Sequence, residues 1–157
     1  MSTETAGPTP EPQPQPQPGS IVVGVDGSAH SAQALLWAVG QARLTGQQVQ
    51  AVTTWQVPVS WGEAAAVIGT VDWEEAARET LAATVADVVP AADADRVVQR
   101  VLMGHPAHTL LEVADGAALL VVGSRGRGGF AGLLLGSVSQ HVISSATCPV
   151  VVIRAQD

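Results

Sequence analysis

One glycine-rich segment of the sequence, residues 123–139, holds the residue types that bind phosphate groups. Glycine lets a backbone approach an anion closely, and successive exposed N–H groups can form an anion-binding nest. Arg125 and Arg127 add positive charge, and Ser137 and Ser139 add hydroxyl groups at the start of an expected helix. A helix N-terminus itself favours anions. The segment therefore predicts a polyphosphate site, with a plain loop carrying incidental serines as the alternative.

Two widespread phosphate-binding motifs do not fit this segment. The chain contains no lysine, which excludes a P-loop because that motif needs a lysine on the phosphates. A dinucleotide-binding fingerprint would accept Ala131 as its third small residue. However, the next helix then begins too late, and no acidic residue lies about twenty residues downstream. We therefore expect backbone N–H groups, hydroxyls and arginine to hold the phosphates.

Asp26 is a second candidate for the site. It directly follows residues 21–25, an apolar run that predicts a strand buried on both faces. Ligands of open α/β sheets bind beyond the carboxyl ends of such strands. Asp26 also precedes Gly27, and Asp-Gly is a common turn pair, so a turn residue is the alternative interpretation.

The other reactive residues indicate neither a metal site nor a catalytic centre. The histidines and Cys148 show no zinc-binding spacing. We interpret the histidines as surface side chains and Cys148 as a small buried one. No Ser-His-Asp order and no pair of carboxylates stands out for catalysis. The four histidines are His30, His105, His108 and His141.

The composition favours one globular domain in the cytoplasm. The chain has 157 residues, and 46% of them are hydrophobic, which is enough for a core built mainly from Ala, Val and Leu. No apolar run approaches the ~20 residues of a membrane helix, the N-terminus lacks signal-peptide features, and the single cysteine cannot form an internal disulfide. A formal net charge of −7 argues against nonspecific nucleic-acid binding.

Residues 1–19 differ from the rest of the chain. They hold six of the ten prolines, mostly in a Pro-Gln alternation, and such a segment cannot build a core. We expect a disordered tail over residues 1–19 and one domain over residues 20–157.

Five segments are predicted as strands, the first, fourth and fifth of them apolar, and the segments between them are predicted as helices. Ser28 is a good N-cap and Gly46 a good stop for the first helix. Asp72 and Glu75 match a capping box, and Pro106 suits a first helical turn. The expected strands are residues 21–26, 49–55, 97–102, 119–122 and 150–153, and the expected helices are about 28–46, 72–90, 106–116 and 137–146.

Strands that alternate with helices imply βαβ units with right-handed crossovers. The expected fold class is therefore α/β, an open and doubly wound parallel sheet with helices on both faces. Ligands of such sheets bind where the strand order reverses. The loops after Val25 and after Val122 are the first places to look.

The glycine spacing resembles the ATP-binding signature of the universal stress protein family. The match consists of Gly123-x-x-Gly126, nine further residues, and then Gly136-Ser137. The resemblance extends over residues 21–154, with other landmarks at 22–28, 104–107 and 148–152.

The resemblance implies a Rossmann-like sheet in the order 3-2-1-4-5 and a homodimer. We expect the dimer to form through the final strand, residues 150–153, because an apolar edge invites pairing with another chain. The implied function is a nucleotide-responsive regulatory module in stress adaptation that binds ATP together with Mg²⁺. The alternatives are a slow ATPase and a dimeric scaffold with a vestigial nucleotide site.

The resemblance also implies roles for individual residues. Asp26 is expected near the adenosine end of the nucleotide, and Thr54 and Val122 are expected to line the adenine pocket. The motif glycines let the backbone close on ribose and phosphates, and the residues after Gly136 meet the β- and γ-phosphates. The expected nucleotide-binding set is Asp26, Thr54, Val122, Gly123, Arg125, Gly126, Arg127, Gly136, Ser137, Val138 and Ser139.

Overall fold

A computed structural model of the chain describes residues 18–59, 69–128 and 132–155. Most of the expected tail lies outside these residues, as do residues 129–131 of the glycine segment. Among the described residues, no helix has the length and apolar character needed to cross a membrane.

Five parallel strands form one sheet in the order β3-β2-β1-β4-β5, as the resemblance implied. In the central strand β1, Val23 is paired with Ala51 on one side and with Val121 on the other. The order reverses between β1 and β4, so the carboxyl ends of these two strands flank the expected binding position. The strands are β1 (Ile21–Gly24), β2 (Val49–Trp55), β3 (Val97–Met103), β4 (Leu119–Gly123) and β5 (Val150–Ile153).

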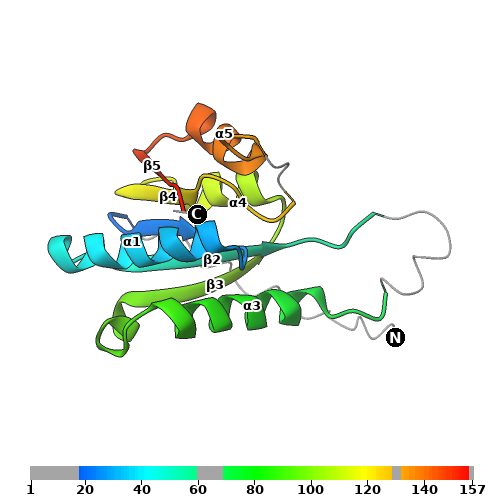
Figure 1. Cartoon of the computed structure of the whole chain (residues 1–157), viewed down its shortest axis with the longest axis horizontal. Coiled ribbons are helices and arrows are strands. Elements are labelled where there is room, and N and C mark those ends of the chain that lie inside the picture. The colour runs from blue at the N-terminus through cyan, green and yellow to red at the C-terminus, as the bar shows by residue number, and fades with distance from the viewer. Residues whose placement is uncertain (1–17, 60–68, 129–131, 156–157) are drawn as a thin grey trace, which may run out of the picture.

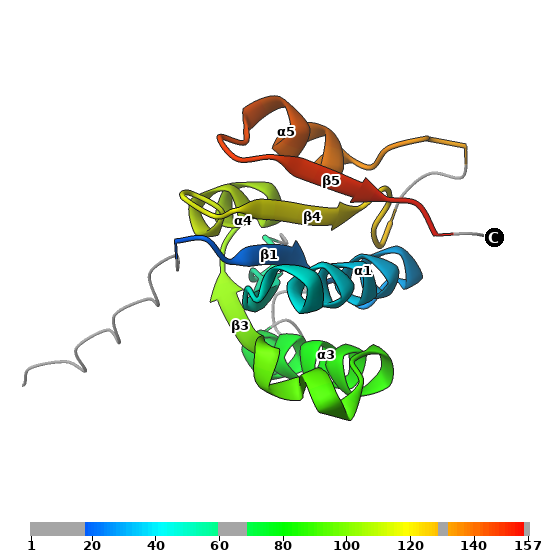
Figure 2. The ribbon, with the colours of Figure 1, turned by 90° about the vertical axis from the view of Figure 1, so that its left-hand side faces the viewer.

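Within the described residues, two helices cover each face of the sheet (Figures 1 and 2). Ile21 and Val23 face the core under α1 (Ala29–Thr45) and α3 (Trp73–Val88), whereas Val22 faces α4 (Pro106–Val113) and α5 (Ser137–Ser145). Alternate residues of β1 thus serve both faces, which is why its sequence is apolar throughout.

Three predicted helix ends are confirmed, whereas α4 ends at Val113 rather than near Gly116. The Ser28 hydroxyl accepts the N–H of Ser31 at 3.2 Å, and the Asp72 carboxylate accepts the N–H of Glu75 at 3.0 Å. Gly46 ends α1 in the left-handed region, with φ 74°. These caps fix where α1 begins, directly after the turn that carries Asp26.

The sequence did not predict the short 3₁₀ helix Ala91–Arg96 between α3 and β3. Its Asp93 is buried and accepts a hydrogen bond from Nε of Arg43, at the end of α1, over 2.8 Å. A long-range ion pair therefore fixes the 3₁₀ helix in place, and no local sequence pattern predicts that helix.

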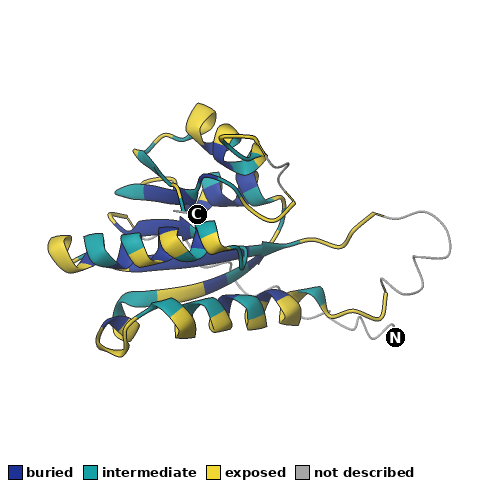
Figure 3. Cartoon of the chain, in the orientation of Figure 1, coloured by how far each residue is buried: buried dark blue, intermediate teal, exposed yellow. Residues whose placement is uncertain are grey.

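The burial of the strands decreases from the centre of the sheet to its β5 edge (Figure 3). The apolar residues of β1 are completely buried, whereas all four residues of β5 are only half-buried, since among the described strands β5 lies at the edge of the sheet beside β4. The core consists mainly of Val, Ala and Leu, as the scarcity of aromatics required.

Candidate functional site

A cavity of about 330 Å³ opens beyond the carboxyl ends of β1, β2 and β4. All eleven residues of the predicted set line it, so the fold brings the whole set together. Asp26 follows β1, Thr54 lies near the end of β2, and Val122 and Gly123 end β4. The loop contributes Arg125, Gly126 and Arg127, while Gly136 caps α5 and Ser137, Val138 and Ser139 form its first turn.

The carboxylate of Asp26 ties the glycine loop to the end of β1. Its Oδ1 accepts the N–H of Ser28 at 2.9 Å, and its Oδ2 accepts the N–H of Arg127 at 3.0 Å. A β-carbon on Gly126 would overlap the same Oδ2, so glycine is needed where the loop passes over the carboxylate.

These hydrogen bonds also decide the charge of Asp26. Burial alone raises the pKa of the carboxyl group, but hydrogen bonds from Ser28 and from the Arg127 N–H favour the charged form and lower the pKa overall. Asp26 is therefore a stable carboxylate at neutral pH. It can accept hydrogen bonds from a ligand, but it is a weak general base.

Ser124 closes the loop onto α5. Its carbonyl accepts the N–H of Gly136 at 2.7 Å and the hydroxyl of Ser139 at 3.0 Å, and its own N–H donates to the carbonyl of Ile153 at 2.8 Å. The Ser139 hydroxyl also lies 2.9 Å from the Gly136 carbonyl. Because this hydroxyl is buried and engaged in the loop, the N–H of Ser139 is the better candidate for contact with a phosphate.

The N-terminus of α5 contributes to the cavity without a side-chain cap. Gly136 occupies the N-cap position with extended backbone angles, φ −76° and ψ 169°. The N–H groups of a first turn have no acceptor within their own helix and carry partial positive charge. Together with the Arg125 side chain, they give this part of the cavity the chemistry of an anion site.

Packing explains two of the three motif glycines. None of them uses positive φ. A β-carbon on Gly123 would lie 2.8 Å from the main chain of His30, because α1 begins directly against β4. Gly126 makes room for Asp26. A β-carbon on Gly136 would meet its nearest neighbour at 3.5 Å, an ordinary contact, so packing does not require glycine there.

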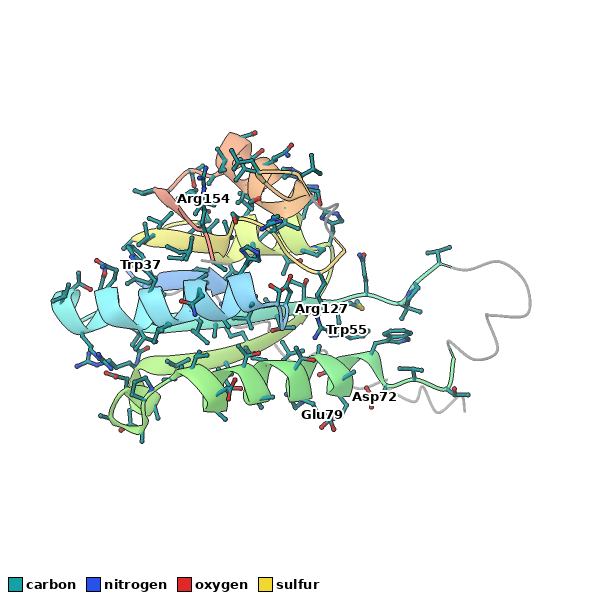
Figure 4. All side chains as sticks on the ribbon, viewed as in Figure 1. Trp37, Trp55, Asp72, Glu79, Arg127 and Arg154 are labelled. Carbon is teal, nitrogen blue, oxygen red and sulfur yellow. The ribbon has the colours of Figure 1, made fainter. Side chains whose placement is uncertain are left out.

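Arg127 lies over the turn that follows Asp26 (Figure 4). A β-carbon on Gly27 would lie 2.5 Å from Nη2 of Arg127 and 2.8 Å from Cγ2 of Thr80 in α3. Gly27 also has φ 82°, so both its backbone and this contact favour glycine. The Nη2 end of the guanidinium thus lies close to Gly27, and its contact with a phosphate stays a prediction.

Seven lining residues were not in the predicted set. Pro106 and Leu110 come from α4. The Gly104-x-Pro106 landmark, which marks the start of this helix, was the sequence signal that could have added α4 to the predicted site. The Ser31 hydroxyl accepts the N–H of Asp26 at 3.2 Å, a contact that helical spacing does not indicate. The full group is Gly24, Val25, Ser31, Val52, Pro106, Leu110 and Gly128.

Three histidines come together on α4 and α5, which their sequence spacing did not suggest. The ring centroids of His105, His108 and His141 lie 5.5 to 6.5 Å apart. No group of three His, Cys, Asp or Glu within the described ranges is arranged to hold a metal ion. The surface interpretation fits the exposed His105 and His108 but not the half-buried His30, which has hydrogen-bond partners in the glycine loop and after β5.

Comparison with known proteins gives one consistent family. The profile described as "Universal stress protein family" matches residues 19–154. A universal stress protein of Mycolicibacterium smegmatis is 40% identical over 135 residues, which cover 85% of this chain and 45% of that protein. The chain spans about half the length of the curated relatives it matches.

Solved structures agree with the fold. Universal stress protein UspA from Lactobacillus plantarum superimposes with a TM-score of 0.74 at 24% identity, over 87% of this chain and 97% of that chain. A universal stress protein crystallised in complex with cAMP matches with a TM-score of 0.54 at 28% identity, over 87% of this chain and 96% of that chain.

The lowered pKa of Asp26 predicts a pH dependence of stability. A carboxyl group whose pKa is lower in the folded state stabilises the protein above its unfolded pKa, and this contribution is lost as the pH falls. The wild type should therefore exceed Asp26→Asn in free energy of unfolding at neutral pH, and the gap should shrink below about pH 4. Denaturant titrations at several pH values measure the gap. A gap that stays constant from neutral to acidic pH would contradict this account of Asp26.

Proposed function

This chain belongs to the universal stress protein family, and on that premise we propose that its cavity binds an adenine nucleotide, with ATP as the ligand. Occupancy of the cavity would act as the signal of a cytoplasmic regulatory module in stress adaptation. One observation carries the proposal: residues chosen from the sequence for nucleotide binding converge on a single cavity of suitable chemistry.

Three kinds of surface in the cavity suit the parts of a nucleotide. The uncapped N-terminus of α5 and Arg125 suit phosphates. The charged Asp26 suits the hydroxyl and amino groups of an adenosine, because it can only accept hydrogen bonds. Apolar side chains from β2, β4 and α4 suit the face of a base. They are Val52, Val122 and Leu110.

The assignments of single residues follow the same division. Thr54 and Val122 are placed with the adenine, and Gly123 and Gly126 with the ribose and the first phosphates. The N–H groups of Ser137, Val138 and Ser139 are placed with the β- and γ-phosphates. A solved universal stress protein in complex with cAMP, 28% identical to this chain, supports an adenine nucleotide as the class of ligand.

Binding is better supported than turnover. The carboxylate of Asp26 already accepts two backbone N–H groups and has a lowered pKa, and the Ser139 hydroxyl is engaged with the loop. Neither group is therefore arranged to activate a water molecule. Mg²⁺ would be held by the phosphates of ATP, since no described group of three acidic or imidazole side chains is arranged to hold it.

The first test of the proposal is the substitution Gly126→Ala. The added β-carbon overlaps Oδ2 of Asp26, so either the carboxylate or the loop must move, and ATP affinity should fall by at least about tenfold. Gly40→Ala is the control, because Gly40 lies in α1 and a β-carbon there meets nothing within 4 Å. Calorimetry with Mg-ATP measures both variants. Equal affinity of Gly126→Ala and wild type, or no binding by the wild type, would refute the proposal.

A second test is the substitution Gly136→Asp, which fills the empty N-cap of α5. A capping aspartate accepts the first-turn N–H groups and favours the helix by roughly 1 kcal/mol. It also places a negative charge where the phosphates are proposed to bind. We expect a melting temperature at or above that of wild type together with loss of ATP binding. Retention of wild-type affinity in a well-folded Gly136→Asp protein would exclude α5 from the phosphate site.

We also propose a homodimer that forms through β5. This strand is at the edge of the sheet, and its four apolar residues are half-buried in the single chain. A twofold axis beside β5 would cover both copies with one self-complementary contact.

The dimer is tested by the substitution Val151→Lys, with Val98→Lys as control. Both valines lie on edge strands, but Val98 is on β3, at the other edge. A charge in the β5 seam should yield monomers, whereas the same change on β3 should leave the dimer intact. Light scattering at tens of micromolar gives the molar masses. A monomeric wild type refutes the dimer, and a dimeric Val151→Lys protein moves the interface away from β5.

A further inference from the structure

One imidazole nitrogen joins the glycine loop to the residues that follow β5. Nδ1 of His30 lies 3.3 Å from Oγ of Ser124 and 3.3 Å from the backbone N of Ala155. The N–H of Ala155 can only donate, so Nδ1 is the acceptor. Nδ1 has a single lone pair, so the Ser124 hydroxyl and the Ala155 N–H share it as donors in two long contacts of 3.3 Å.

The main chain of His30 is fixed from two sides. It is the second residue of α1, whose first turn is capped by Ser28. Its backbone also lies so close to Gly123 that a β-carbon on Gly123 would come within 2.8 Å of it. The imidazole therefore extends from a rigid support rather than from a loop.

The contact with Ser124 reaches the part of the loop that shapes the cavity. The carbonyl of Ser124 accepts the N–H of Gly136 and the hydroxyl of Ser139, and these bonds set where α5 begins. The N–H of Ser124 is bonded to Ile153, the last residue of β5. The orientation of Ser124 thus depends on His30 through its side chain and on β5 through its backbone.

We propose that His30 is a positioning residue that couples the nucleotide site to the chain segment leaving β5. This inference rests on the proposed function for its effect on ATP, but the contacts themselves do not depend on any ligand. A change at Ala155 alters what Nδ1 accepts, and the same nitrogen orients Ser124 at the base of the glycine loop. A change in the segment after β5 can therefore alter nucleotide binding, and nucleotide binding can alter that segment, through the His30 side chain.

Two substitutions of similar polarity separate this role from general packing. In His30→Asn, the amide oxygen can occupy the position of Nδ1, so an acceptor for Ser124 and Ala155 is retained. In His30→Gln, the longer side chain carries its amide out toward the position of the distal ring nitrogen, and that acceptor is lost. We expect ATP affinity close to wild type in His30→Asn and about three- to tenfold weaker in His30→Gln, the range of one or two modest hydrogen bonds.

Amide exchange gives a readout that needs no nucleotide. The Ala155 N–H donates directly to His30, so its exchange measured by NMR should be faster in His30→Gln than in wild type and near wild type in His30→Asn. Unchanged protection of Ala155 in His30→Gln overturns the inference. This result stands even if the wild type binds no adenine nucleotide, an outcome that would count against the proposed function alone.

The coupling itself is tested with Ala155→Pro, which removes the N–H donor and keeps the chain complete. Without the Ala155 donor, the Nδ1 lone pair is left to Ser124 alone, so if His30 transmits the change, Ala155→Pro alters ATP affinity in the wild-type background and has no further effect in His30→Gln. Additive changes in the double variant would show that the two residues act independently and would overturn the inference. So would equal losses in His30→Asn and His30→Gln, because only the second removes the acceptor.

Discussion

The carboxylate of Asp26 accepts N–H groups from Ser28 and Arg127, and the geometry of the cavity depends on this pair of hydrogen bonds. One oxygen fixes the turn that leads into α1, and the other holds the glycine loop against the end of β1. The strand order brings β1 and β4 side by side, so a single short side chain can reach both loops. Its burial is tolerated because both oxygens are bonded, which keeps the group charged.

Much of the fold could be predicted from local patterns. Residues 49–55 and 150–153 were predicted as strands with the bounds that the structure has. The caps at Ser28 and Asp72 followed from side-chain chemistry within three residues. The strand order and the expected places of Thr54 and Val122 at the site came from the resemblance to a family rather than from periodicity, because pairing between distant segments leaves no local trace.

Most of the features that escaped prediction depend on long-range contacts. Three such contacts join segments far apart in the chain. They are the hydrogen bond of the Ser139 hydroxyl to the Ser124 carbonyl, the position of the Arg127 side chain near Gly27, and the two contacts of His30. The motif glycines were chosen from the sequence, but the sequence could not show why glycine stands at each position. Glycine at 123 leaves room for the start of α1 and glycine at 126 leaves room for the Asp26 carboxylate, whereas a β-carbon at Gly136 would make only ordinary contacts.

The uncapped N-terminus of α5 has a consequence for how the proposed phosphate site can change over evolutionary time. Main-chain N–H groups are supplied by every residue except proline, so substitutions among most side chains leave these donors in place. The constraint on the sequence is therefore mainly one of exclusion: bulky or acidic side chains must be kept away from the start of the helix. A lineage could lose the site through a single capping residue and regain it by removing that residue, with the sheet, the core and the loop hydrogen bonds unaltered.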